Sequence, residues 1–193
     1  ILYSYLAESL NDYYKENRYR IRQRTKIDST GSDFFTWSEA DFKKNIYKYY
    51  EQSLTDENEL IKTPLKDFTE VLNYGENYNQ YQSTLYDLLA KRYIDFLRNN
   101  TYNPFSKKTH YLNNKGLFET PEDFVKIDLS HIEDGTNKIR ILETYQKLTL
   151  LHLQQKDSLS VLITTLERLG YVKQQGSYTN SKELYEKALQ YLL

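Results

Sequence analysis

The chain has 193 residues, of which 39% are hydrophobic and 27% are charged, and its 26 Lys and Arg residues nearly balance its 27 Asp and Glu residues. This length suffices for one domain with a sizeable core, and the near-neutral charge argues against a nucleic-acid binder, which needs a basic excess to neutralise phosphates. A mean hydropathy of −0.78 argues against a transmembrane helix, and six Gly and three Pro are too few turn-forming residues for an all-β fold.

Apolar residues recur at helical spacing from the start of the chain. They predict one long amphipathic helix from Leu2 to Arg24. Ser38, with Asp41 three residues later, has the pattern of a capping box, and Trp37 and Phe42 have the spacing of a hydrophobic staple. We expect the helix that starts here to bury Phe42, Ile46, Tyr49 and Tyr50.

The middle of the chain mixes helices with irregular segments. A helix is predicted from Leu65 to Tyr74, with Gly75 ending it. Thr84 and Asp87 form a second capping pattern. The buried stripe expected after it consists of Leu85, Leu88, Leu89, Tyr93, Phe96 and Leu97. Residues 76–83 and 99–119 lack helical periodicity, and irregular segments of this length are often functional.

The last third of the chain predicts helices joined by short links. Thr120 and Pro121 open a short helix to about Ile127. The segment Asn137–Gln155 is apolar on most sides, so we expect it to be the most buried helix, with Leu142 in the core. After the link Lys156-Asp157, the expected buried stripe is Leu159, Leu162, Ile163, Leu166 and Leu169, and the final one is Leu184, Tyr185, Ala188, Leu189 and Leu192.

Short links between helices favour antiparallel neighbours. We therefore predict an all-α fold of about two thirds helix, without a sheet of three or more strands. Its antiparallel helical hairpins would stack in a tetratricopeptide-like, irregular α-solenoid arrangement. We expect residues 1–193 to form a single helical domain. Because the chain begins at Ile1 without a start codon or leader, we interpret it as a fragment or processed form of a longer protein.

Residues that could carry chemistry are sparse. The chain has no cysteine, which excludes disulfides, thiolate zinc sites and cysteine nucleophiles. The histidines His110, His131 and His152 lack the i+3 or i+4 partners of a metal site, and we interpret His152 as a hydrogen-bonded core or edge histidine and not as a ligand. No phosphate-binding glycine loop, nucleophile elbow or metalloprotease motif occurs. We expect no catalytic residue, metal or cofactor, and no enzyme activity.

A basic run and the tyrosines leave two further possibilities. Lys15, Arg18, Arg20, Arg22, Arg24 and Lys26 could bind an anionic partner, but cations at a helix C-terminus that offset the macrodipole explain them better. Most of the 20 tyrosines, such as Tyr49, Tyr93 and Tyr185, fall on predicted core stripes. Tyr78, Tyr81, Tyr102 and Tyr111 lie in irregular segments instead, and they are our candidates for a contact surface.

Several stretches resemble a known family. They are Leu2 to Thr25 with its Tyr13-Tyr14 pair, Thr36-Trp37, Thr63-Pro64-Leu65-x-Asp67-Phe68, the tail from Arg140 to Leu189, and above all Ser83-Thr84-Leu85-Tyr86-Asp87-Leu88-Leu89-Ala90. Together they are similar to the N-terminal helical region of the large alpha-2-macroglobulin-like proteins of Bacteroidetes. The resemblance covers nearly the whole chain, and its motifs are structural.

The resemblance implies a cell-envelope protein that traps proteases through downstream macroglobulin domains. The family's thioester cysteine cannot lie in this cysteine-free chain, so no functional residue carries over. The expected function is a non-catalytic N-terminal scaffold or interaction domain. Its expected partners are downstream domains of the same chain, and envelope proteins or proteases are further candidates. The alternative is a glycan-binding helical module resembling the tyrosine-rich starch-utilisation lipoproteins of the same bacteria.

Overall fold

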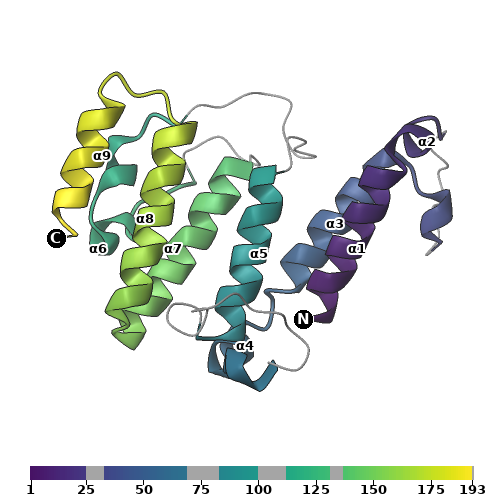
Figure 1. Cartoon of the computed structure of the whole chain (residues 1–193), viewed down its shortest axis with the longest axis horizontal. Coiled ribbons are helices and arrows are strands. Elements are labelled where there is room, and N and C mark those ends of the chain that lie inside the picture. Colours follow the sequence, from purple (N-terminus) through teal and green to yellow (C-terminus); the bar gives the residue numbers. More distant parts are fainter. Residues whose placement is uncertain (25–32, 69–82, 100–111, 131–136, 193) are drawn as a thin grey trace.

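The computed structural model describes residues 1–24, 33–68, 83–99, 112–130 and 137–192. Helices α1 to α9 and short 3-10 turns make up 77% of these residues. The β pairing within this described part is limited to isolated bridges between Pro64 and Thr84 and between Leu112 and Gly176. The all-α class is therefore confirmed (Figure 1).

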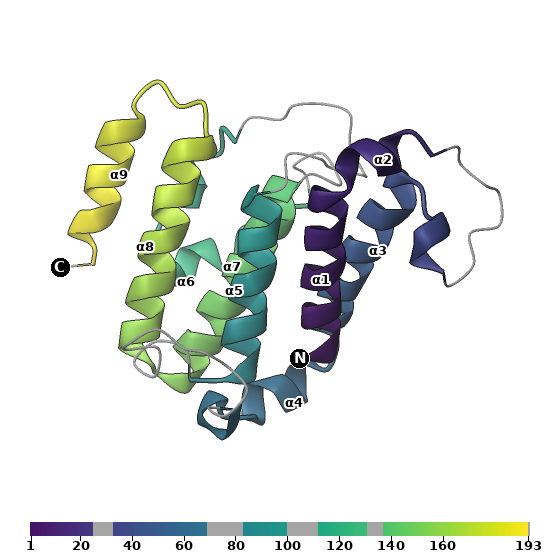
Figure 2. The same ribbon diagram turned by 45° about the vertical axis from the view of Figure 1, so that its right-hand side comes forward.

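The N-terminal part of the chain forms an arm of two long helices, α1 (Leu2–Glu16) and α3 (Glu39–Gln52), which lie side by side (Figures 1 and 2). The long first helix that the sequence predicts is broken at Asn17, and a short helix, α2 (Arg18–Arg22), follows. Asn17 Nδ2 donates to the Tyr13 carbonyl at 2.9 Å, because an asparagine side chain competes with the backbone for helical hydrogen bonds. Beyond the break, Ile21 is fully buried.

The predicted start of α3 is confirmed, after a 3-10 turn over Phe34–Thr36. The Asp41 amide donates to Ser38 Oγ at 3.3 Å, and the Ser38 amide donates to Asp41 Oδ2 at 3.0 Å. The rings of Trp37 and Phe42 pack edge to face, with centroids 5.4 Å apart. The buried face of α3 includes Phe42, Ile46 and Tyr50 as expected, whereas Tyr49 is only partly buried.

Helix α5 (Leu85–Asn99) is the centre of the molecule. It follows α4 (Glu57–Lys62) and a 3-10 turn over Leu65–Phe68; the rest of the helix predicted to Tyr74 lies outside the described residues. Nine of the 15 residues of α5 are buried, against nine of 19 in α7 (Asn137–Gln155). The prediction that Asn137–Gln155 is the most buried helix is therefore wrong. A larger fraction of α5 is buried because α5 lies between α7 and the N-terminal arm (Figure 1).

Aromatic side chains fill the space between α3 and α5. Phe96 stacks on Tyr50 with ring centroids 4.4 Å apart and meets the edge of Tyr47 at 4.9 Å. Rings of this size bury large apolar areas and let two helices pack at a wide separation. Tyr47 and Tyr50 are therefore core residues that join α3 to α5.

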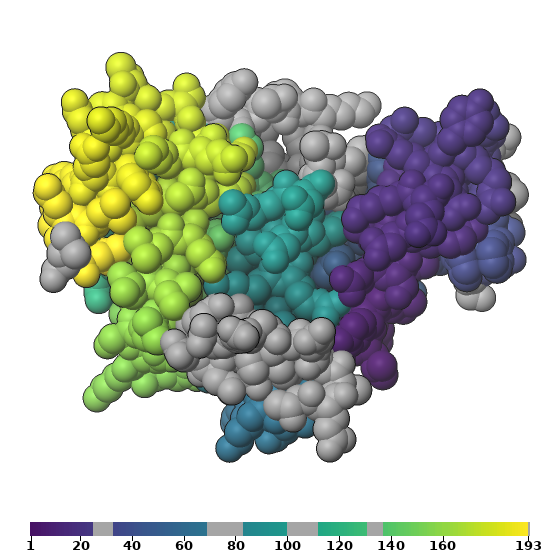
Figure 3. All heavy atoms as spheres, viewed as in Figure 1, coloured from purple at the N-terminus to yellow at the C-terminus, as the bar shows by residue number. Residues whose placement is uncertain are grey.

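The C-terminal helices α7, α8 (Ser158–Gln175) and α9 (Ser181–Gln190) are successive neighbours, and they lie at the opposite end of the molecule from the arm (Figures 1 and 3). A 3-10 turn over Lys115–Phe118 and the short helix α6 (Pro121–Phe124), capped by Thr120 as predicted, pack beside them. Lys156, at a φ of 57°, makes the tight turn into α8. The hairpin arrangement is as expected, and the tetratricopeptide-like stacking stays a prediction.

The orientation of α8 differs from the prediction. Leu159 and Leu166 are 43% and 39% exposed, Leu162 and Ile163 are only partly buried, and Leu169 alone of the predicted stripe is in the core. The buried residues are instead Ser160, Thr164, Thr165, Arg168, Leu169, Tyr171 and Val172. The interactions of Arg168, described below, hold this more polar side of α8 inward.

Candidate functional site

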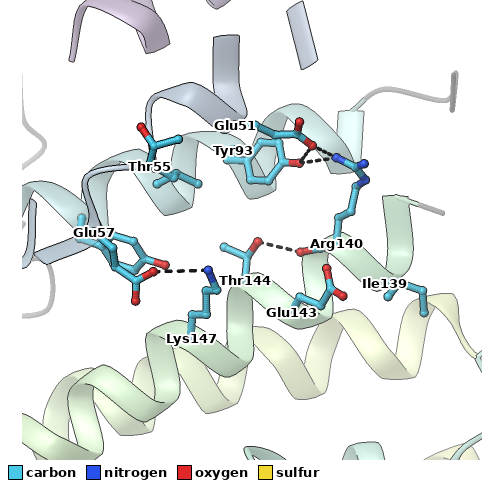
Figure 4. A pocket seen from close by; sticks show the side chains of 11 residues that line it. Glu51, Thr55, Glu57, Tyr93, Ile139, Arg140, Glu143, Thr144 and Lys147 are labelled. Carbon is cyan, nitrogen blue, oxygen red and sulfur yellow. Dashed lines mark hydrogen bonds and ion pairs between the residues drawn. The ribbon is translucent and has the colours of Figure 1, made fainter. Parts of the chain in front are cut away.

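A cleft of about 470 Å³ opens between α3, α4 and α7, with α5 behind it (Figure 4). Several charged side chains and two tyrosines line it, so it is a candidate for a polar ligand site near the centre of the molecule. The lining residues are Glu51, Leu54, Thr55, Glu57, Tyr86, Tyr93, Ile139, Arg140, Glu143, Thr144 and Lys147.

Three side chains at one end of the cleft satisfy one another. Arg140 forms an ion pair with Glu51 and donates to the Tyr93 hydroxyl at 3.2 Å, and that hydroxyl donates to Glu51 Oε1 at 3.4 Å (Figure 4). Burial lowers the pKa of Arg140 and raises the pKa of Tyr93. The guanidinium of Arg140 and the phenol of Tyr93 therefore link α3, α5 and α7.

The other end of the cleft is more open. Lys147 Nζ lies 3.4 Å from Glu57 Oε2, in a pair whose side chains are about half exposed, and such pairs contribute little to stability. Thr144 Oγ1 donates back to the Arg140 carbonyl at 2.7 Å. The rings of Tyr86 and Tyr93 are 1% and 5% exposed, so neither offers a flat face for stacking a sugar. The arrangement resembles an electrostatic link between helices more than a prepared ligand site.

A second polar cluster is fully enclosed. Asp87 and His152 are each 1% exposed, with His152 Nε2 3.3 Å from Asp87 Oδ1. The other oxygen of Asp87 accepts from the Thr84 amide and hydroxyl, both at 2.9 Å, which confirms the predicted capping box. Burial lowers the pKa of His152, while the neighbouring Asp87 opposes that shift. His152 is therefore a core histidine, which decides between the core and edge placements that the sequence left open.

The remaining predicted candidates separate into two groups. Tyr78, Tyr81, Tyr102, Tyr111, His110 and His131 lie outside the described residues, as does Lys26. Within the described part, the basic run is largely engaged by its own chain: Arg20 donates to Asn17 Oδ1 at 2.9 Å, Arg22 pairs with Glu39 at 3.3 Å, and Arg24 donates to the Trp37 carbonyl at 2.9 Å. Across the same residues, no group of three or more potential ligands is arranged to hold a metal ion.

Sequence reasoning missed Arg168, which is fully buried in α8. Its Nη1 and Nη2 donate to the carbonyls of Leu117 and Glu119 at 2.9 and 2.8 Å, and its guanidinium lies 4.1 Å from the centre of the Phe124 ring. Burial lowers the pKa of Arg168 to about 10. No pattern in the sequence could have predicted these contacts, because the acceptors are backbone carbonyls about 50 positions away from Arg168 along the chain.

No protein-family model, curated protein or solved structure matches this chain. In the described ranges, no helix combines the length and the apolar character needed to cross a membrane.

Proposed function

We propose that this chain is a non-catalytic helical scaffold or interaction domain of a protease-trapping, alpha-2-macroglobulin-like protein of the cell envelope. The observation that supports it most is the structural role of Ser83 to Ala90, the stretch that carries the resemblance. Thr84 and Asp87 cap α5 inside the protein, and Leu85, Leu89 and Ala90 are buried. The matching residues thus build the central helix, as the structural motifs of a scaffold would.

The main cleft also favours a scaffold over an enzyme. The partly buried Arg140 and the buried Tyr93 are paired with each other and with Glu51, and the second cation, Lys147, is paired with Glu57. A catalytic group needs a pKa matched to its task and a free path to substrate. Burial raises the pKa of Tyr93 and lowers the pKa of Arg140, and both groups are engaged with each other and with Glu51, which suits a structural link.

The first test is the encoded sequence on the C-terminal side of Leu193. Macroglobulin β-domains there would support the family, and a stop codon directly after Leu193 would contradict it. The chain by itself should show no protease, glycosidase or phosphatase activity. It should also not inhibit a protease, because the resemblance places trapping in downstream domains.

The second test concerns the proposed contact surface. Capture of partners from an envelope extract is compared between the wild type and a variant with Tyr78, Tyr81, Tyr102 and Tyr111 changed to Ser. Reduced capture by the variant is expected, since tyrosines are frequent anchors of protein interfaces. Equal capture would contradict a role of these four tyrosines, and oligosaccharide binding in calorimetry that the changes abolish would favour the glycan-binding alternative.

A further inference from the structure

A further cavity, of about 440 Å³, lies where α6, the turn from α7 to α8 and the residues that follow α9 meet, at the end of the molecule opposite the arm (Figure 1). Its volume is typical of sites for small molecules. Apolar and polar side chains line it in similar numbers. The lining residues are Thr120, Pro121, Glu122, His152, Leu153, Lys156, Ser158, Val161, Leu162, Tyr191 and Leu192.

The apolar part of this cavity comes from four separate segments. Pro121 of α6 is buried, and Leu153 of α7, Val161 and Leu162 of α8, and Leu192 after α9 are partly buried. Because these segments surround the space from different sides, the cavity is a pocket with walls and not the flat side of one helix. It can therefore enclose the apolar part of a small ligand.

Two opposite charges lie among the lining residues. Glu122 and Lys156 are exposed, and neither forms an ion pair or a side-chain hydrogen bond with another described residue. The Ser158 hydroxyl lines the same cavity and can donate a hydrogen bond. Asp157 occupies the first amides of α8, since its carboxylate accepts from the Ser160 amide at 3.1 Å. The available charges are thus the two side chains and not the helix terminus.

His152 gives the cavity a buried polar group. It lines the cavity although it is only 1% exposed, and its Nε2 lies 3.3 Å from Asp87 Oδ1. Its Nδ1 has no hydrogen-bond partner of normal geometry among the described residues. The carboxylate favours the proton on Nε2, which leaves Nδ1 as an acceptor. Unpaired buried polar atoms are rare in folded proteins, so a donor on a ligand would supply what is missing.

We propose that this cavity binds a free α-amino acid with a large aromatic side chain that carries one hydrogen-bond donor, as tryptophan does. The α-carboxylate contacts Lys156 and Ser158, and the α-ammonium contacts Glu122. The ring lies against the aliphatic side chains, with its N–H toward His152. A ligand with a single charge would leave either Glu122 or Lys156 uncompensated, whereas both charges of an α-amino acid are used.

Titration of the chain with L-tryptophan to about 20 mM, followed by two-dimensional NMR of the backbone amides, tests the site, because a ligand of this size should bind with a dissociation constant of about 0.1–3 mM. Saturable shifts are expected at the residues that line the cavity. L-Phenylalanine should bind about two- to tenfold more weakly, because its ring has no donor. Absence of saturation, shifts that map elsewhere, or equal binding of phenylalanine would contradict the proposal.

The two charges are tested by pairing variants with ligand analogues. Lys156→Gln should weaken tryptophan binding about threefold, as expected for an exposed ion pair, but leave the binding of tryptophan amide, which lacks the carboxylate, unchanged. Glu122→Gln should likewise weaken the binding of tryptophan but not of N-acetyltryptophan, which lacks the ammonium. Lys126→Gln is the control, because Lys126 is exposed, pairs with Asp123 and does not line the cavity.

Two outcomes would overturn this assignment of the charges. If both cavity variants bind tryptophan as the control does, Lys156 and Glu122 are not part of the site. If N-acetyltryptophan binds the wild type as tightly as tryptophan, the cavity accepts a peptide C-terminus instead of a free amino acid.

Discussion

Arg168 shows how a single side chain decides the placement of a helix. Buried charges are normally paired or hydrogen-bonded, because moving an ion out of water is costly. Here the carbonyls of Leu117 and Glu119, at the end of a 3-10 turn, take the place of a carboxylate, and the Phe124 ring covers one face of the guanidinium. With a pKa of about 10, Arg168 remains charged at neutral pH. It ties α8 to the segment that leads into α6.

Arg168→Met should therefore lower the free energy of unfolding by about 2–4 kcal/mol, because the buried carbonyl of Leu117 and the partly buried carbonyl of Glu119 lose their charged donor. Arg168→Lys should lose less, since an ammonium still supplies a donor but not the planar fork that reaches both carbonyls. Urea denaturation followed by circular dichroism measures both. If the Met variant is as stable as the wild type, the guanidinium makes no net contribution to the free energy of unfolding.

At the scale of the element, α8 illustrates what helical periodicity leaves open. The apolar spacing indicates a helix with one apolar side, and hydrophobic burial alone would place that side against the core. The opposite side carries threonines that bond their own helix, such as Thr165 to the Val161 carbonyl at 2.7 Å, so it can be buried at little polar cost. Arg168 then fixes this orientation, and part of the apolar side is left at the surface.

The contrast between two leucines tests this orientation. Leu142 in α7 is fully buried, whereas Leu162 in α8 is only partly buried. Leu142→Ala should cost about 2–5 kcal/mol because it leaves a cavity, and Leu162→Ala should cost about 1 kcal/mol or less. Urea midpoints measured on both variants decide the matter. Equal losses would show that Leu162 lies in the core after all.

At the scale of the whole molecule, polar links connect the separate helices. His152 of α7 meets Asp87 of α5, Lys91 of α5 meets Glu167 of α8, and Tyr14 of α1 donates to Glu39 of α3 at 2.7 Å. Partial burial alone would raise the pKa of Glu39, but hydrogen bonds from Lys43 and Tyr14 lower it to about 2. The links differ in burial, and the link between His152 and Asp87 is the enclosed one of these three, with both side chains 1% exposed.

Stability should therefore depend on pH in a defined direction. Burial lowers the pKa of His152 below the value of about 6.5 that it has in the unfolded chain. The unfolded chain then binds a proton more readily, so the contribution of neutral His152 is complete above pH 6.5 and is lost as the pH falls below it. The contribution of Glu39 is lost only at lower pH, between its unfolded value of 4.5 and about 2.

Thermal unfolding measured from about pH 8 to about pH 5 checks this, because the window brackets the unfolded histidine pKa. The melting temperature of the wild type should fall as the pH drops below 6.5. His152→Gln should be less stable at pH 8 but show a flatter profile. If the melting temperatures of the wild type and the variant fall in parallel as the pH drops, a group other than His152 accounts for the pH dependence.

The sequence by itself determined the all-α class, the two capping boxes at Ser38 and Thr84 and the bounds of α7, because each rests on neighbours within one or two helical turns. Only the tertiary structure decided which side of α8 faces the core, which carbonyls accept hydrogen bonds from Arg168 and which helix is central. It also brought Glu51, Tyr93 and Arg140 together from three helices. These features depend on contacts between segments far apart in the chain, and local periodicity carries no record of them.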